Sequence, residues 1–326
     1  MKRGFFKVLA VLLCCGAALA APSKLELREG LVSVAYPPGN EDAARRALAE
    51  IQAGLREFGD RLPPGDKPVY VLIAENAAEF NRHASSFLPG QVSALARPAQ
   101  GLIVLQPPKM RRHGYEYGGT IRHELVHILL DRNTNPAYLP NWLNEGLAMF
   151  LAREYQFATP ITIASMMFEG RIIPYQRLDM AFLTPGEEMQ FGDAYAQALS
   201  MTRYLHQRAG ADAFWRIVLA TREKHFADAL REHAGVDVFE FWDGYMRSLW
   251  LVAVVGALAS GSFFTPAAVI VIIAFFRVRS RNRRTLDQWA EQEAADDAAP
   301  PLMTWEEAIN REDTYIPGID DEDEEY

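Results

Sequence analysis

Two histidines four residues apart, with a glutamate directly after the first, form the segment of this chain with the clearest chemical potential. They are His123, Glu124 and His127, within the run Thr-Ile-Arg-His-Glu-Leu-Val-His-Ile-Leu-Leu. On a helix, residues i and i+4 share a face, so both imidazoles can present a ring nitrogen to one metal ion. This HExxH pattern is typical of zinc hydrolases. Because it is so short, it also arises by chance in chains that bind no metal.

The chemistry of zinc hydrolysis explains why these residue types are needed. A catalytic zinc ion has three protein ligands and one open coordination position. It lowers the pKa of a bound water to about 7, and a glutamate that is not a ligand can accept the proton as the water attacks a carbonyl carbon. We therefore predict Zn²⁺ as the cofactor, His123 and His127 as two of its ligands, and Glu124 as the catalytic base.

A candidate for the third ligand lies about twenty residues downstream. The segment 140–150 is predicted to be a helix with Asn141 as its N-cap, which places Glu145 in the first turn. Packing of its apolar residues, such as Leu143 and Leu147, against the HExxH helix would bring Glu145 to the metal. The alternative is a surface glutamate that is favoured near a helix N-terminus by the helix dipole.

The two segments together resemble a known group of enzymes. HExxH followed at this distance by Asn-Glu-Gly-Leu-Ala, residues 144–148, is similar to the gluzincin metallopeptidases, and specifically to the bacterial peptidase MA-like family. The resemblance covers residues 118–205 and includes the helical pattern of residues 193–205. It implies a zincin-like fold and hydrolysis of peptide or protein substrates. It also implies that Tyr195 donates to the oxyanion of the tetrahedral intermediate. The alternative is a tyrosine that only packs in the core or supports a ligand.

The chain departs from the thermolysin-like branch of this group at one position. That branch carries an aspartate four residues after the ligand glutamate, which orients a zinc histidine, but this chain has Met149 there. Zinc histidines normally donate their second ring N–H to a carboxylate or carbonyl. Asp193 is the candidate for this role, and Asn144 is assigned to substrate or backbone contacts. The glutamate motif that holds a free amino terminus in aminopeptidases is not evident before HExxH, which favours an endopeptidase.

The elements around these motifs predict an α+β fold, with a small mixed sheet lobe followed by a mainly helical lobe. Strands are predicted at 31–36, 69–74 and 101–108, and a helix at 41–58. The third strand is either a sheet edge to which an extended substrate could add, or an ordinary buried strand. Downstream helices are predicted by their apolar periodicity. They cover residues 194–209, 211–222, 225–233 and 238–247.

The two ends of the chain predict its location. Residues 1–20 are basic and then apolar and end in Ala-Leu-Ala, which is typical of a cleavable signal peptide. Residues 249–276 contain no charge and are long enough for a transmembrane helix. The arginines that follow indicate a cytoplasmic side, so we expect a single-pass cell-membrane protein whose domain 21–248 is extracytoplasmic. Both cysteines lie in the signal segment, so the domain has neither disulfides nor thiolate ligands.

The remaining segment, 277–326, is basic and then acidic, and is predicted to be a disordered cytoplasmic tail that could bind a cytoplasmic partner. Much of the net charge of −9 comes from this tail, and nothing in the chain suggests nucleic-acid binding. The sequence thus predicts a membrane-anchored zinc metallopeptidase. The alternative is a catalytically silent zinc-containing domain that binds polypeptides or signals through the tail. A site with four protein ligands would instead indicate structural zinc.

Overall fold

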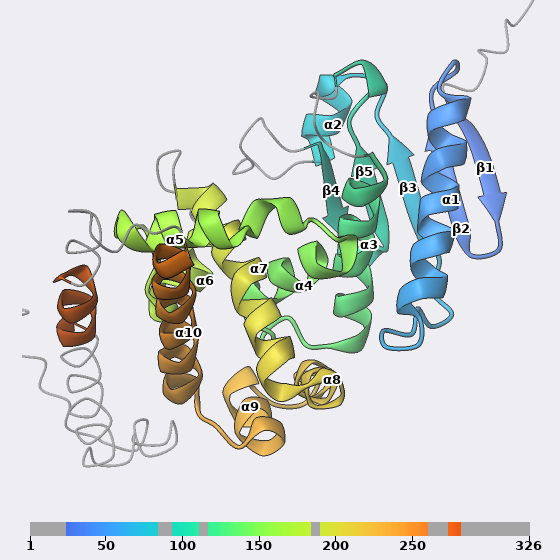
Figure 1. Ribbon diagram of the computed structural model, residues 1–326. Helices are drawn as coiled ribbons and strands as arrows, with labels where there is room; N and C mark the ends of the chain where they lie inside the picture. Colours follow the sequence, from blue (N-terminus) through green and yellow to red (C-terminus); the bar gives the residue numbers. More distant parts are fainter. Residues whose placement is uncertain (1–23, 84–92, 111–116, 184–189, 260–272, 282–326) are drawn as a thin grey trace, which may run out of the picture. The chain divides into compact units, whose positions relative to one another are not determined.

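The computed structural model describes residues 24–83, 93–110, 117–183, 190–259 and 273–281 (Figure 1). The predicted signal peptide and most of the predicted tail lie outside the described residues. Contacts divide the chain into two units, Met1–Phe263 and Phe264–Tyr326. The first unit holds all the predicted site residues. In the second, the described residues 273–281 are helical.

A five-stranded mixed sheet forms the first part of the first unit, with the order β1-β2-β3-β5-β4. The inner strands β2, β3 and β5 are parallel, while β1 and β4 pair antiparallel at the two edges. The strands are β1 (Leu25–Glu29), β2 (Val32–Tyr36), β3 (Val69–Ile73), β4 (Ala94–Arg97) and β5 (Leu102–Leu105). The predicted strands correspond to β2, β3 and β5. Since β4 lies outside β5, the prediction of an edge position for β5 is wrong, and its alternative, a buried strand, holds.

Helices cover both faces of this sheet. Phe80 of helix α2 (Ala77–His83) packs against one face, through Leu72, Leu102 and Val104. Because side chains alternate along a strand, Val71 and Ile103 point to the opposite face. Helices α1 (Glu41–Phe58) and α3 (Tyr117–Asn133) contact both the sheet and each other. Helix α1 has the predicted bounds, and its packing supports the helix that carries the HExxH motif.

The rest of the first unit is helical, as predicted (Figure 1). Helix α4 contacts α3 on one side and α7 on another, so it lies between the HExxH helix and the later helices. Short 3₁₀ turns form at Pro98–Gln100, Pro108–Met110 and Tyr155–Ala158. The remaining helices are α4 (Asn141–Ala152), α5 (Pro160–Phe168), α6 (Tyr175–Leu183), α7 (Gln190–Ala209), α8 (Ala211–Ala220), α9 (Phe226–Ala234) and α10 (Val238–Ala259).

The predicted boundary between domain and membrane segment falls inside one helix. Helix α10 continues through residues 248 and 249 without a break, and Leu249 and Trp250 are only 8% and 7% exposed. Residues 260–272, in the middle of the predicted span, lie outside the described part of the chain. Among the described residues, no helix combines the length and the apolar composition that a bilayer crossing requires. The transmembrane segment therefore stays a prediction.

Candidate metal centre and active site

Helix α3 presents the HExxH residues because apolar side chains fix its other faces. Ile121, Leu125 and Ile128 are fully buried against neighbouring elements. With these residues turned into the core, His123 and His127 lie one turn apart with their ring centroids separated by 4.9 Å. Both imidazoles are partly exposed, at 13% and 12% of their side-chain surface. The histidines are therefore held side by side on a face that solvent can reach.

Helix α4 brings the third residue to this face. Glu145 Oε2 lies 3.5 Å from His123 Nε2 and 3.6 Å from His127 Nε2. In a tetrahedral zinc site with bonds of about 2.0–2.1 Å, two ligand atoms are separated by roughly 3.4 Å. The distances from Glu145 to the two histidines thus match two edges of a zinc tetrahedron, and all three potential ligand atoms lie within 4.8 Å of one another. His123, His127 and Glu145 form a group compatible with Zn²⁺.

Whether these three atoms fit a metal ion can be judged from the hydrogen bonds that they make within the protein. Glu145 Oε2 is buried, yet no described donor satisfies it. The distances to the two imidazoles exceed the usual range for an N–H···O hydrogen bond, about 2.7–3.2 Å. A buried carboxylate oxygen without a donor is costly unless a ligand completes it. The donor set of two nitrogens and one oxygen is one that Zn²⁺ accepts, so the residues present fit this ion.

Two contacts fix helix α4 in the position that Glu145 requires. Its N-cap is Pro140, which offers no side-chain cap, so the predicted cap at Asn141 is wrong. Instead, Asp179 of α6 accepts a hydrogen bond from the backbone N–H of Trp142 at 3.0 Å. At Gly146, an added Cβ atom would lie 2.6 Å from the carbonyl oxygen of Ala198 in α7. The glycine after the ligand therefore allows α4 and α7 to approach closely.

The supports of the two histidines differ from the predicted one. Asn144 Oδ1 lies 2.9 Å from His127 Nδ1 and can accept the N–H of this ring. Glu154 Oε2 lies 3.4 Å from His123 Nδ1. Asp193, which was predicted to orient a histidine, is wrong for this role, because it pairs with the guanidinium of Arg171. The assignment of Asn144 to substrate or backbone contacts is likewise corrected.

Charge at the site favours a cation between the carboxylates. Burial opposes protonation of His123, but Glu145 and Glu154 beside it outweigh burial and hold its pKa well above the usual value. Burial also raises the pKa of Glu145, but interactions with His127, His123 and Tyr195 together outweigh burial, and the net pKa is lowered. A proton therefore stabilises the group in the same place where Zn²⁺ would.

Glu124 differs from these ligands because it does not belong to the converging group. It is 8% exposed, and burial raises the pKa of its carboxyl group. It follows His123 on α3 and lies close enough to both histidines for their charges to act on it. Glu124 is thus a buried carboxylate next to the three residues that could hold a metal ion, without being one of them.

Tyr195 of α7 reaches the same group of residues. Its hydroxyl lies close enough to the Glu145 carboxylate to help lower the pKa of that carboxyl group. Burial and the nearby carboxylates raise its pKa well above the usual value, so the hydroxyl stays protonated. The helix that carries it is held by Gln197, whose side-chain amide exchanges two hydrogen bonds with the backbone of Ile173, at 2.8 and 2.7 Å. Tyr195 is thus placed among the site residues.

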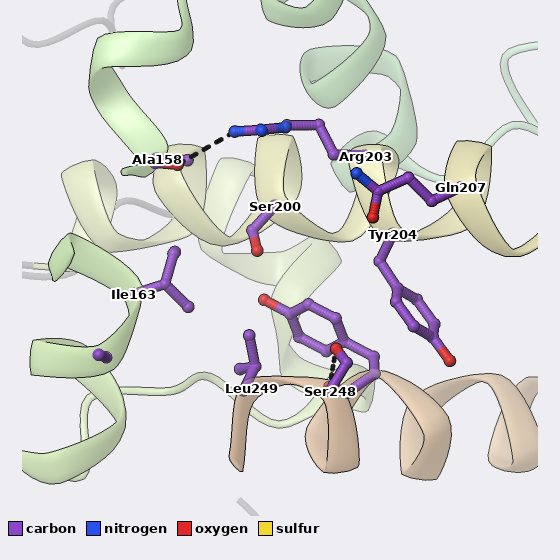
Figure 2. Close-up of a pocket in the computed structure, with 10 residues that line it drawn as sticks. Ala158, Ile163, Ser200, Arg203, Tyr204, Gln207, Ser248 and Leu249 are labelled. Atoms are coloured by element: carbon purple, nitrogen blue, oxygen red, sulfur yellow. Dashed lines mark hydrogen bonds between the residues drawn. The ribbon is translucent and has the colours of Figure 1, made fainter. Parts of the chain in front are cut away.

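A cavity of about 190 Å³ lies between α5, α7 and α10 (Figure 2). Figure 2 shows Ser200, Arg203 and Gln207 along α7 on the side that faces the cavity. None of the predicted site residues lines it. Helix α7 therefore has one face that contacts α4 and supplies Tyr195, and another that borders this separate cavity.

Comparison with known proteins gives similarity at the level of solved structures alone. No protein-family model matches the chain, and no curated protein sequence matches it. The chain is similar to an M1 zinc metallopeptidase from Deinococcus radiodurans, with 17% identity and a TM-score of 0.38. A two-domain M1 zinc metallopeptidase bound to L-tryptophan also has 17% identity, with a TM-score of 0.37. Each match covers 70% of this chain and 50% of the other, so the chain spans about half their length.

Proposed function

We propose that this protein is a zinc-dependent peptidase of the gluzincin type, related to the bacterial peptidase MA-like family. One observation carries the proposal. His123 Nε2, His127 Nε2 and Glu145 Oε2 converge at zinc-like spacing, while Glu124 lies beside them as a buried carboxylate that is not one of the converging groups. Within the described residues the group has three members, as in catalytic sites, which keep the fourth position open.

In this proposal the ligands, Glu124 and Tyr195 each have a separate role in hydrolysis. His123, His127 and Glu145 would hold a zinc ion, which would supply a Lewis acid for the scissile carbonyl and for water. Glu124 accepts a proton from the attacking water and can return it to the leaving nitrogen. Its raised pKa makes it a stronger base than an exposed glutamate. Tyr195, whose hydroxyl stays protonated, can donate to the carbonyl oxygen as negative charge develops there.

The sheet edge next to the HExxH helix is a suitable place for an extended substrate. Strand β4 is the edge strand on this side, and it contacts α3. An edge strand offers backbone N–H and C=O groups to an added strand, so a peptide could pair with β4 and pass in front of the site. We propose an endopeptidase on this basis, because strand pairing recognises the middle of a chain and requires no free terminus.

The proposed location follows from sequence features alone. Residues 1–20 resemble a signal peptide, and residues 249–276 are apolar and are followed by arginines. We propose that the catalytic domain is extracytoplasmic, that a single span anchors it in the cell membrane, and that the acidic tail faces the cytoplasm. Substrates would then be proteins or peptides close to the membrane surface.

The test compares the full-length wild-type chain, purified in mild detergent and loaded with zinc, with its Glu124→Gln variant on a peptide library. Glu232→Gln, which removes an exposed carboxylate from α9, is the matched control. We expect hydrolysis by wild type and control, and a loss of about 10²–10⁴-fold in the Glu124 variant with its zinc content retained. Bound zinc without hydrolysis by wild type would favour the silent polypeptide-binding domain instead.

A further inference from the structure

Glu57, near the end of α1, binds two arginines that directly precede residues of the metal centre. Its Oε2 accepts a hydrogen bond from Arg122, and its Oε1 accepts one from Arg153 Nη2 at 2.9 Å. Arg122 is the residue before His123, and Arg153 is the residue before Glu154. One carboxylate therefore joins α1, the HExxH helix and the turn after α4, although neither arginine is part of the predicted site.

The Glu57–Arg122 pair is partly shielded from solvent. The Arg122 side chain is 18% exposed, and its guanidinium lies over the Phe58 ring, 5.2 Å from the ring centroid. Burial raises the pKa of Glu57, but the two arginines outweigh burial and the net pKa is lowered. The carboxylate is therefore ionised at neutral pH and holds Arg122 on the α1 side of α3. By contrast, the Arg153 side chain is 70% exposed, and its guanidinium pairs with this carboxylate at 2.9 Å.

The backbone of Arg153 is unusual for an arginine. It has φ 62° and ψ 35°, in the left-handed region, and it is the one non-glycine residue with positive φ among those described. This position ends α4, and its N–H caps the carbonyl of Phe150. Glycine is the preferred residue at such a helix end, because a side chain there costs free energy. The left-handed backbone of Arg153 costs free energy, and its side chain binds Glu57. We infer that the side chain at this position has a role in holding the turn.

The residue after this turn faces the metal centre. The backbone N–H of Glu154 donates to the carbonyl of Met149 at 3.0 Å, which completes the helix end and fixes where Glu154 leaves α4. Its carboxylate then lies 3.4 Å from His123 Nδ1, on the ring edge opposite the Nε2 atom that faces Glu145. Glu154 is also the residue directly before the short 3₁₀ turn at Tyr155–Ala158, so its position depends on how the two residues between α4 and this turn are held.

We propose that Glu57, Arg122 and Arg153 form a clamp that holds the turn after α4 so that Glu154 orients His123 for the metal. The inference rests on the proposed function, and it makes these three residues positioning residues that contact neither zinc nor substrate. Glu154 Oε2 lies 3.4 Å from His123 Nδ1, and a carboxylate beside the second ring nitrogen of a metal histidine fixes the orientation of the ring. Loss of such a carboxylate typically weakens metal binding about 10–100-fold. The clamp would act on zinc affinity through Glu154 alone.

Arg153→Gly separates this role from a merely structural one. Glycine relieves the left-handed backbone, so the zinc-free variant should unfold at the same temperature as wild type or higher. Loss of the clamp should nevertheless weaken zinc binding by about 3–30-fold, somewhat less than loss of the Glu154 carboxylate itself. A residue that served stability alone could not lower zinc affinity while leaving the melting temperature unchanged or raised.

The experiment measures the zinc dissociation constant of the full-length chain by competition with a chelator, together with the melting temperature of the zinc-free form. The variants are Arg153→Gly, Glu154→Gln and the double variant, with Arg45→Ala, from an exposed ion pair on α1, as the control. If the clamp acts through Glu154, the double variant should bind zinc as Glu154→Gln does, without an additional loss. Arg153→Lys, which keeps the positive charge, should recover part of the affinity.

Two results would overturn the proposed clamp and leave the proposed function intact. In the first, Arg153→Gly binds zinc as tightly as wild type. In the second, the losses of the two single variants add in the double variant, so that Arg153 acts independently of Glu154. A wild-type chain that binds no zinc would overturn the proposed function, and the inference with it. The affinity of the wild type therefore distinguishes the two failures before any variant is considered.

Discussion

The C-terminal end of helix α3 and its HExxH part, here called the ligand end, both carry buried or partly buried polar side chains, but the C-terminal end satisfies them more completely. There, Arg132 donates to the carbonyl oxygens of Pro64 and Pro68 at 2.9 and 2.7 Å. Asn133 donates to the carbonyl oxygen of Pro63 at 2.9 Å. These bonds tie α3 to the loop between α1 and β3, and every group named here has a partner within the protein.

At the ligand end, two buried polar atoms have no hydrogen-bond partner among the described residues. They are His123 Nδ1, which has the Glu154 carboxylate 3.4 Å away, and Glu145 Oε2 of the adjacent helix α4. An unsatisfied buried polar atom lowers stability, whereas a satisfied one is close to neutral. The comparison indicates that one end of α3 is built to hold the fold and the other to hold a ligand. Variants at the ligand end should therefore mainly lower zinc affinity, and variants at the C-terminal end should mainly lower the free energy of unfolding.

The largest effect is expected from Glu145→Ala at the ligand end. Zinc sites with four ligands bind with about 10–16 kcal/mol, so one ligand accounts for roughly 2.5–4 kcal/mol, or about 10²–10³-fold in affinity. Zinc content after dialysis against a weak chelator measures this loss. Zinc-free Glu145→Ala loses a buried carboxylate oxygen without a donor, but it also loses the negative charge that stabilises a protonated His123, so its stability should change less than that of Arg132→Met. A drop in melting temperature larger than that of Arg132→Met would contradict the assignment of this end to ligand binding.

Arg132→Met at the anchored end should have the opposite pattern. It leaves two carbonyl oxygens without their donors, and each such loss costs about 1–3 kcal/mol, so we expect a decrease of about 2–4 kcal/mol in the free energy of unfolding. Urea denaturation measures this decrease. Zinc should still bind to the folded variant in a 1:1 ratio. If zinc affinity fell more than stability, the two ends of α3 would not be separable.

A smaller effect is expected from Asn144→Ala, which removes the acceptor 2.9 Å from His127 Nδ1. Loss of such a support typically weakens metal binding by about 10–100-fold. Chelator competition measures the change. Asn144→Asp keeps an acceptor oxygen in the same place and should retain most of the affinity. Equal losses in both variants would mean that Asn144 acts on the packing of α4 and not on the imidazole.

The sequence predicted those parts of the fold that have long, regular apolar patterns. Helix α1 was located from its apolar periodicity, the HExxH helix from the spacing of its motif, and the three inner strands from their β-rich runs. The edge strand β1 was missed because Leu-Glu-Leu-Arg-Glu is mostly charged and exposed. Strand β4 and helix α2 are short, and they are stabilised by contacts distant in sequence, such as Phe80 with Leu95 and Val104. Local patterns carry little information about such elements.

Within the site, the residues of the HExxH and Asn-Glu-Gly motifs were predicted. The side chains that contact the second ring nitrogens of the two histidines were not. HExxH and Glu145 follow from helical spacing and the Asn-Glu-Gly motif. Glu154 was not predicted, because it follows a helix end that has Arg153 where a glycine would have signalled the turn. Asn144 was recognised as adjacent to the ligand, but its direction depends on how α4 crosses α3. Hydrogen-bond partners of this kind depend on tertiary geometry, which no spacing rule specifies.

The smallest expected effect is a pH dependence at Glu57, which lies near the ligand end of α3 but is satisfied like the anchored end. Burial raises the pKa of Glu57, but its arginine partners outweigh this, so the folded-state pKa is below the usual 4.5. A depressed carboxyl pKa gives stability that is present above the unfolded value and lost as pH falls through the folded value. The difference in melting temperature between the zinc-free wild type and zinc-free Glu57→Gln should therefore be constant near neutral pH. It should shrink below about pH 4.5.

Thermal melts of the two zinc-free proteins between neutral and acidic pH measure this difference. Because Glu57 is 38% exposed, salt should screen its ion pairs, and the difference at neutral pH should decrease in about 1 M NaCl. If the difference in melting temperature changed with neither pH nor salt, Glu57 would act through packing, for instance by holding Arg122 over Phe58. The proposed clamp would then depend on shape more than on charge, and Arg153→Lys would not be expected to recover zinc affinity.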